Sequence, residues 1–223
     1  MNTFRTNRAA ELPLHCDAVD WSDAASILQQ GGEALKLACA PEILRLLLGT
    51  VVETPRLLAK CERFNLFSKI VLMQGTSPAW KLRLHCFGAP TLEAHHHRAS
   101  FCAQVIAGSY RHMLFGANSS LDLERLKKPL KPLFMQIQRP GSAYMIDHEM
   151  VHITLAERDT VSIILQGPAV SEVFDIYDIE SGLRRVRYSD SETQGIQEPG
   201  ESKLGAADLR DLTDMLTAMG VLG

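Results

Sequence analysis

The sequence predicts a mostly β domain, with helices before an antiparallel barrel and one helix after it. Between Phe67 and Ser189, short β-prone runs alternate with turn residues such as Gly88, Gly108 and the pair Pro140-Gly141. Many short strands separated in this way are typical of a barrel or sandwich. The flanking zones instead repeat their apolar residues at helical spacing. A chain of 223 residues is long enough to fill one core of this kind.

We expect residues 1–66 to form a helical extension packed on the barrel. Ser22 is placed to cap a helix through Ala24–Leu28, and Gly31-Gly32 is expected to end it. Pro41 and Pro55 each stand at a first-turn position, where proline is favoured, and open two further helices.

Residues 67–189 form the predicted barrel, and residues 190–223 a linker followed by a C-terminal helix. The linker Asp190–Lys203 is rich in Ser, Glu and Gly. The helix Ala206–Met219 places four apolar residues on one face: Leu209, Leu212, Met215 and Leu216. This face is expected to pack on the barrel or on a second subunit.

Net charge and cysteine content indicate which binding partners and which cellular compartment to expect. A net charge of −3 gives no reason to expect nucleic acid or an anionic membrane as partner. No apolar run approaches a membrane span, and no apolar stretch follows the N-terminal Met1–Arg8 as in a secretory signal. The five cysteines are scattered, without a CxxC pair. We therefore expect a cytoplasmic protein.

The segment Glu93–Cys102 contains three consecutive histidines. On a strand, His95 and His97 project to one side and His96 to the other. Two imidazoles at i and i+2 on one face can bind one first-row metal ion, with a third ligand supplied from elsewhere in the fold. A surface loop or an adventitious metal-binding triplet is the alternative interpretation.

A second segment supplies a candidate for the third ligand. In Arg139–His152, a Pro-Gly turn opens a hydrophobic strand, a short loop follows, and His152 begins the next strand. His148 is an alternative ligand, although we favour a loop position for it. His112 is expected to be an ordinary strand residue. Glu93 and Asp147 are local candidates to accept the second N–H of a ligand histidine.

The two segments together resemble the two motifs of the cupin superfamily, and the resemblance implies a cupin-type jelly-roll barrel. HxH matches His95–His97, and Pro140, Gly141 and His152 match the second motif. The carboxylate that usually follows HxH is missing, because residues 98–104 contain no Asp or Glu. This departure favours a ligand set of three histidines, His95, His97 and His152.

Within cupins, the chain resembles the thiol dioxygenases, especially cysteine dioxygenase. The family's L-x-L-x-C-W-x-x-G is similar to Leu82–Gly88, a cysteine follows the second histidine by five residues at Cys102, and A-Y-x-x-D-x-x-x-x-H matches Ala143–His152. The family's catalytic His and Tyr are replaced by Ile164 and Gln166.

The resemblance suggests further site residues, each with a plainer alternative. Cys102, Tyr144 and Gln166 are the candidate catalytic residues, and Arg63, Arg83 and Gln166 are the candidate substrate-binding residues. The family's substrate-binding arginine aligns with Phe64, one place from Arg63. Packing is the alternative for Cys102 and Tyr144, and solvated surface for Arg63.

These residues predict a mononuclear Fe(II) oxygenase that uses O₂ and a small thiol, amino or carboxylic acid. Three neutral imidazoles leave coordination positions for substrate and O₂, although imidazole also suits Zn, Ni and other divalent ions such as Mn. The alternatives are another metal-dependent cupin enzyme (hydroxylase, isomerase or lyase) and a non-catalytic cupin that binds a small ligand. A homodimer is one option for the assembly.

Overall fold

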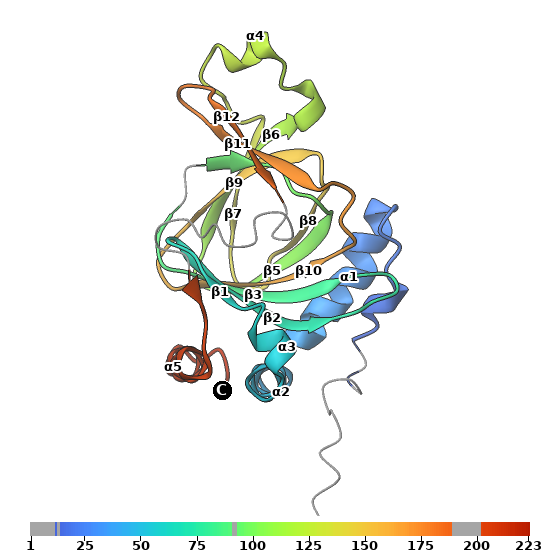
Figure 1. Ribbon diagram of the computed structural model, residues 1–223, viewed down its shortest axis with the longest axis vertical. Coiled ribbons are helices and arrows are strands. Elements are labelled where there is room, and N and C mark those ends of the chain that lie inside the picture. The colour runs from blue at the N-terminus through green and yellow to red at the C-terminus, as the bar shows by residue number, and fades with distance from the viewer. Residues whose placement is uncertain (1–11, 13, 91–92, 189–201) are drawn as a thin grey trace, which may run out of the picture.

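The computed structural model describes residues 12, 14–90, 93–188 and 202–223. Two antiparallel sheets face each other and form a jelly-roll barrel (Figure 1). The first sheet has the strand order β13 (Ser202–Lys203), β1 (Glu62–Arg63), β2 (Phe67–Gln74), β3 (Lys81–Phe87), β10 (Thr160–Gln166), β5 (Phe101–Ala107) and β8 (Ala143–Ile146). The second has the order β12 (Arg184–Tyr188), β11 (Val173–Asp178), β4 (Glu93–His95), β9 (Met150–Ala156), β6 (Tyr110–Ala117) and β7 (Phe134–Gln138).

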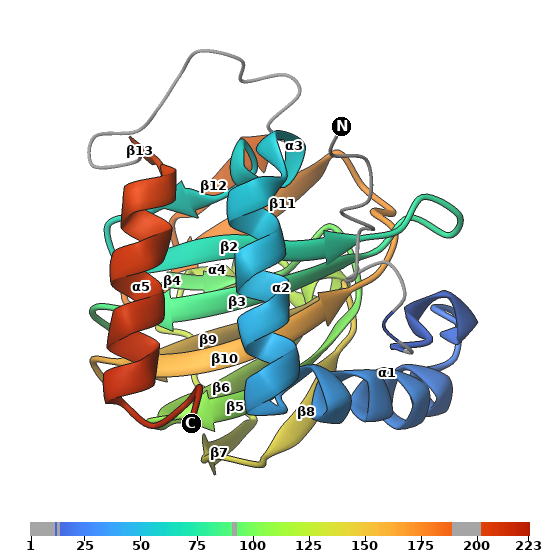
Figure 2. The same ribbon diagram turned by 90° about the horizontal axis from the view of Figure 1, so that it is seen from below.

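Helices cover the outer face of the first sheet, whereas α4 lies beyond the second (Figure 1). Figure 2 shows α2 and α5 side by side across the strands of the first sheet. The helical segments are η2 (Cys16–Ala18), α1 (Ala24–Ala38), α2 (Pro41–Glu53), α3 (Pro55–Leu58), η3 (Asn118–Ser120), α4 (Leu123–Leu126) and α5 (Ala206–Ala218). The predicted fold class is therefore confirmed, with helices before the barrel and one after it.

The side chains of β3 and β10 alternate between the two sides of the first sheet. On β3, Leu82 and Leu84 are fully buried in the core shared with the helices. Val161, Ile163 and Leu165 of β10 belong to the same core. Because successive side chains of a strand point to opposite faces, Lys81, Arg83 and His85 of β3 and Ser162, Ile164 and Gln166 of β10 face the barrel interior. Fully burying each of these aliphatic side chains contributes about 1.5–3 kcal/mol.

Two details of the predicted helix α1 are wrong. Asp23, not Ser22, caps it, since its carboxylate accepts from the backbone N–H groups of Ala25 and Ser26. The helix also continues past Gly31-Gly32 to Ala38. A Cβ on Gly31 would lie 2.5 Å from Cys102 Sγ, so this glycine lets the helix approach β5 closely. Packing, rather than helix termination, explains the glycine.

The helix starts at Pro41 and Pro55 are confirmed, and so is the turn at Pro140-Gly141. Gly141 has φ +86°, and the N–H of Ser142 donates to the carbonyl of Arg139 across the turn. Proline followed by a positive-φ glycine fits a type II turn. The turn leads into β8 and, after it, the loop before His152.

Near the C-terminus, Ser202–Lys203 pair with β1, although the sequence predicted a linker there. Residues 190–201 of that linker, like Met1–Arg8, lie outside the described part of the chain. No helix within the described ranges is long and apolar enough to span a membrane. All five cysteines are free thiols.

Candidate metal centre

Two histidines on strands of the second sheet and one just beyond a strand meet inside the barrel. His95 ends β4 and pairs in register with His152 of β9, so their side chains project from neighbouring strands to the same face. His97 lies two residues beyond His95, and its backbone N–H donates to the carbonyl of His148 at 3.3 Å. The ring centroids of His95, His97 and His152 lie 4.8–4.9 Å apart in each pair. The predicted ligand residues thus come together.

The donor atoms of these three histidines fit one metal ion. One ring nitrogen from each lies within 4.8 Å of the others, and the Nε2 atoms of His97 and His152 are 2.7 Å apart. Nitrogens that bind one ion at about 2.1 Å lie roughly 3–3.4 Å from one another, so a small adjustment suffices. The set is all-imidazole, which suits Fe, Zn, Ni and Cu.

Burial keeps this cluster uncharged. Desolvation is the main cause that lowers the pKa of His95, and it holds the pKa values of His97 and His152 well below the usual range. Mutual repulsion among the histidines acts in the same direction. Because a metal binds the neutral ring, protons compete only weakly for these ligands near neutral pH.

His95 and His152 are each oriented by a hydrogen-bonding neighbour, and neither neighbour is a carboxylate. His95 Nδ1 lies 3.1 Å from the backbone oxygen of Glu93, whose carboxylate pairs with Arg185. Asp147 accepts from Ser100 Oγ instead of a ligand histidine. The expectation for these two side chains is therefore not met, because Arg185 engages one carboxylate and Ser100 the other.

His112 is a supporting residue that the sequence did not reveal. Its Nε2 lies 2.8 Å from Nδ1 of His152. Burial lowers the pKa of His112 to about 4, so the neutral ring can accept a hydrogen bond from Nδ1–H of His152. That bond leaves Nε2 of His152 available to an ion. The sequence offered one signal for this role: Tyr110 and His112 stand at i and i+2, so they share one face of β6, the strand that pairs with β9.

His96 and His148 lie outside the ligand set, as predicted. His96 is buried; its Nδ1 lies 3.1 Å from the carbonyl of His148, and its Nε2 is 3.4 Å from Asp175. The ring of His148 contacts Asp147 and Ser100. The side chains of His95, His96 and His97 therefore alternate between the two sides of the sheet, as they would on a strand, although β4 ends at His95.

The structure places two of the candidate residues away from the histidines. Cys102 belongs to the core beneath α1, with Sγ against Gly31 and the carbonyl of Leu165. Burial raises its pKa to about 12. Arg63 lies at the surface on β1 and pairs with Asp208 of α5 at 2.9 Å. Both expected roles are corrected, since one side chain points to the outer core and the other to solvent.

The other candidates face the interior. Gln166 lies opposite Phe101 of β5, whose ring is 4.8 Å from that of His97. Tyr144 packs 4.6 Å from the ring of His112, and its hydroxyl is 2.5 Å from that of Tyr110. Burial raises the pKa of Tyr144, so it keeps its proton. Arg83 projects inward from β3, opposite Ile164 of β10.

Similarity searches give no family model and no curated protein that matches the sequence. Comparison with solved structures gives matches of low similarity. KdgF from Halomonas sp. is 18% identical with a TM-score of 0.35, over 47% of this chain and 82% of its own. Ectoine synthase from P. lautus is 13% identical with a TM-score of 0.41, over 70% of this chain and 86% of its own.

A third similar structure, an RmlC-like cupin from Shewanella frigidimarina, is 15% identical with a TM-score of 0.37, over 50% of this chain and 85% of its own. This chain has a cupin-type fold. The two facing sheets and the position of the histidines inside the barrel carry that conclusion. At such identities and TM-scores, the likenesses do not identify an activity.

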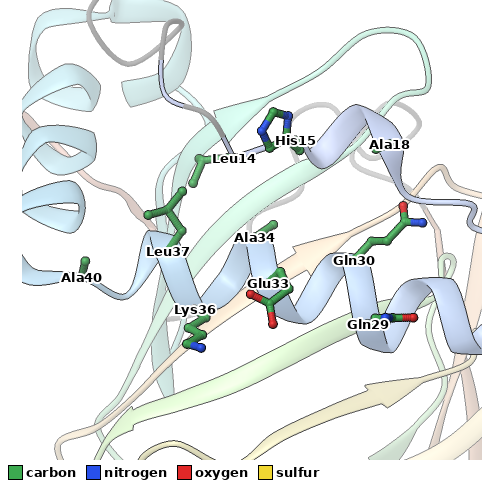
Figure 3. A pocket seen from close by; sticks show the side chains of 10 residues that line it. All are labelled: Leu14, His15, Ala18, Gln29, Gln30, Glu33, Ala34, Lys36, Leu37 and Ala40. Carbon is green, nitrogen blue, oxygen red and sulfur yellow. The ribbon is translucent and has the colours of Figure 1, made fainter.

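A separate cleft of about 850 Å³ lies outside the barrel, between α1 and the segment before it (Figure 3). Leu14 and His15 line one side, and Gln30, Glu33 and Leu37 of α1 line the other. None of the clustered histidines lines it. The candidate metal centre therefore belongs to the barrel interior and not to this cleft.

Proposed function

We propose that this cupin-type barrel is a mononuclear metal enzyme in which His95, His97 and His152 hold Fe(II). The proposed reaction is the oxidation of a small thiol, amino or carboxylic acid by O₂. The convergence of three neutral imidazoles inside the barrel, His152 buried and His95 and His97 half-buried, with His112 behind His152, is the observation that carries the proposal. A divalent ion there would act as a Lewis acid and, as iron, would supply redox chemistry with O₂.

The surrounding side chains would bind and orient the substrate. Phe101 packs against His97 and restricts water on that side of the cluster. Tyr144, held by Tyr110, offers a hydroxyl that keeps its proton at neutral pH. From the opposite sheet, Arg83 and Gln166 would contact the polar groups of the substrate.

A metal-dependent isomerase, lyase or hydroxylase is the second candidate, and one observation favours it. Ile164 and Gln166 face the interior in place of the histidine and tyrosine of the thiol dioxygenases, and Cys102 lies outside. The thiol-specific groups of that family are therefore not reproduced. Turnover without O₂, or with Zn or Mn instead of iron, would select this class.

The test begins with untagged protein, because a His tag binds metal itself. Metal analysis should find one ion per chain in the wild type and none in His97→Ala. An oxygen electrode then screens small thiols, amino acids and carboxylic acids. Iron content with substrate-dependent O₂ uptake supports the oxygenase, whereas protein that binds no divalent ion contradicts both candidates.

A further inference from the structure

A buried aspartate lies on the outer side of the histidine segment. Asp175 belongs to β11 and precedes Ile176, which pairs in register with His95 of β4. Because successive residues of a strand point to opposite faces, Asp175 projects away from the face that carries His95. The residue is only 3% exposed. A buried carboxylate is costly unless it is paired and hydrogen-bonded, so its partners indicate its role.

Several side chains converge on one oxygen of this carboxylate. Oδ2 of Asp175 lies 2.8 Å from a guanidinium nitrogen of Arg184, and the amide of Asn118 donates to it at 3.3 Å. The hydroxyl of Tyr177 donates to the side-chain oxygen of Asn118 and holds that amide in place. Nε2 of His96 lies 3.4 Å from the same Oδ2. Burial raises the pKa of Asp175, but hydrogen bonds and charge, chiefly from Arg184, outweigh it and lower the pKa.

His96 connects Asp175 to the segment that carries the ligands. Its backbone N–H donates to the backbone carbonyl of Asp175 at 3.3 Å, and its ring Nδ1 lies 3.1 Å from the carbonyl oxygen of His148. The two ring nitrogens of His96 therefore face acceptors on two different segments. The same carbonyl of His148 accepts from the backbone N–H of His97 at 3.3 Å. His96 thus joins β11 to the loop before β9 at the point where the chain leaves β4.

The backbone of His97 depends on these contacts. β4 ends at His95, and its pairing with β9 joins His95 to His152. Beyond that pair, the N–H of His97 bonds to His148, and its carbonyl oxygen lies 3.3 Å from Nδ1 of His96. The groups that bind one ion must be held to within about 0.5 Å of the productive geometry. Whatever fixes His96 therefore also fixes one of the three candidate ligands.

We propose that Asp175 is a positioning residue for the metal centre, and that it acts through His96 to hold His97 in place among the three ligands. The inference deepens the proposed function and rests on it. Asp175 contacts neither the ion nor the substrate. Its role differs from that of His112, which orients the ring of one ligand, because Asp175 holds the backbone of the segment from the outer side of the sheet.

Cobalt binding tests this role. Asp175→Ala should still bind one Co(II) per chain, because all three ligands remain. Its affinity should be lower by about tenfold, at the small end of the loss typical for supporting residues of a metal site. The absorption spectrum of the Co(II)-saturated protein should also change, since its bands depend on ligand geometry. A residue that only stabilises the fold would leave that spectrum unchanged.

Asp175→Asn is the conservative variant, because it keeps the size of the side chain and an oxygen that accepts from Arg184. It should recover part of the affinity and of the wild-type spectrum. Asp178→Ala is the matched control on the same strand. The exposed carboxylate of Asp178 accepts from the backbone N–H groups of Glu180 and Ser181, so its removal should leave Co(II) affinity and spectrum unchanged.

A double-mutant cycle tests whether Asp175 acts through His96. If it does, Asp175→Ala combined with His96→Gln should lose about as much Co(II) affinity as the larger single loss, because both substitutions break one chain of contacts. Losses that simply add would show independent effects and would overturn the inference. So would wild-type affinity and spectrum in folded Asp175→Ala.

Hydrogen exchange provides a measurement that needs no metal. In the metal-free protein, Asp175→Ala should speed the NMR-detected exchange of the backbone N–H of His97, which bonds to His148. Thermal unfolding establishes that each variant is folded. If Asp175→Ala is not, the same measurements on Asp175→Asn decide, and wild-type values for affinity, spectrum and exchange in that variant overturn the inference.

Metal content separates this inference from the proposed function. If the wild type binds an ion and Asp175→Ala binds it equally well, only the inference fails. If the wild type binds no ion, the proposed function fails. Faster exchange at His97 in Asp175→Ala would then still support the positioning of this segment, whereas unchanged exchange would overturn that as well.

Discussion

Nε2 of His112 lies 2.8 Å from Nδ1 of His152 inside the barrel. This contact links β6 to β9, which pair in register so that His112 lies opposite Thr154, two residues along β9 from His152. It gives the candidate ligand a fixed ring orientation without any carboxylate.

Replacing His112 should weaken metal binding without removing a ligand. In His112→Phe, Nδ1–H of His152 loses its acceptor, and we expect metal affinity to fall about 10–100-fold. His112→Gln restores a hydrogen-bonding side chain and should lose less. Competition between the protein and a chromophoric chelator for Co(II) or Zn(II) measures the affinities. His148→Ala is the control, and an equal loss in that variant would contradict the specific role of His112.

The consecutive histidines should separate into ligands and a structural residue. His97→Ala should abolish stoichiometric metal binding, whereas His96→Gln should retain it. Because His96 is buried beside Asp175, its replacement should lower the free energy of unfolding by about 1–2 kcal/mol. Metal analysis and urea unfolding provide the two readings. Retention of metal by His97→Ala with loss in His96→Gln would reverse the assignment.

Adjacent glycines of α1 should respond to alanine in opposite directions. Gly31→Ala places a Cβ 2.5 Å from Cys102 Sγ, and such overpacking costs about 1–3 kcal/mol. A Cβ on Gly32 meets nothing within 4 Å, so Gly32→Ala should stabilise the helix by up to about 1 kcal/mol. Urea unfolding compares the two variants.

Removal of the Cys102 thiol is the control for the contact between Gly31 and Cys102. Cys102→Ala should relieve part of the cost of Gly31→Ala, because the new methyl group occupies the space of the sulfur. The single variant Cys102→Ala should keep its full metal content, since Cys102 lies outside the barrel interior. Loss of metal in this variant would restore a role for the thiol at the site.

Acid should destabilise the metal-free protein through its buried histidines. Burial holds the pKa values of His85, His97 and His152 well below their usual value, which is about 6.5 in an unfolded chain. The unfolded state therefore binds more protons as the pH falls below about 6.5, and stability declines from there toward the folded-state pKa values. Above about pH 6.5 these histidines are neutral in both states, so they should contribute almost no pH dependence to the free energy of unfolding.

Urea midpoints between pH 5 and pH 8 measure this dependence. His85→Gln should make the decline shallower, since one proton fewer is taken up on unfolding. Saturating Zn(II) should raise the midpoint at pH 7 because the ion binds the folded state. A midpoint that rises as the pH falls from 7 to 5.5 would contradict the assignment of neutral buried histidines.

The order of helices, strands and turns followed from local patterns. Pro41, Pro55 and the pair Pro140-Gly141 act within a few residues of themselves, so their effects are readable from the sequence. Gly31 did not act locally. It appears as a helix stop in the sequence, but its role comes from Cys102, which lies far along the chain.

By itself, the sequence determined the strand-rich fold and the three histidines proposed as ligands, because strand alternation and motif spacing are properties of neighbouring residues. Only the tertiary structure decided which side of each strand faces the interior. It placed Cys102 in the outer core and His112 behind His152, and it directed Lys81 and Arg83 inward. The reason is that two facing sheets and one layer of helices assign every alternating residue to one side or the other, and that assignment depends on contacts between segments distant in sequence.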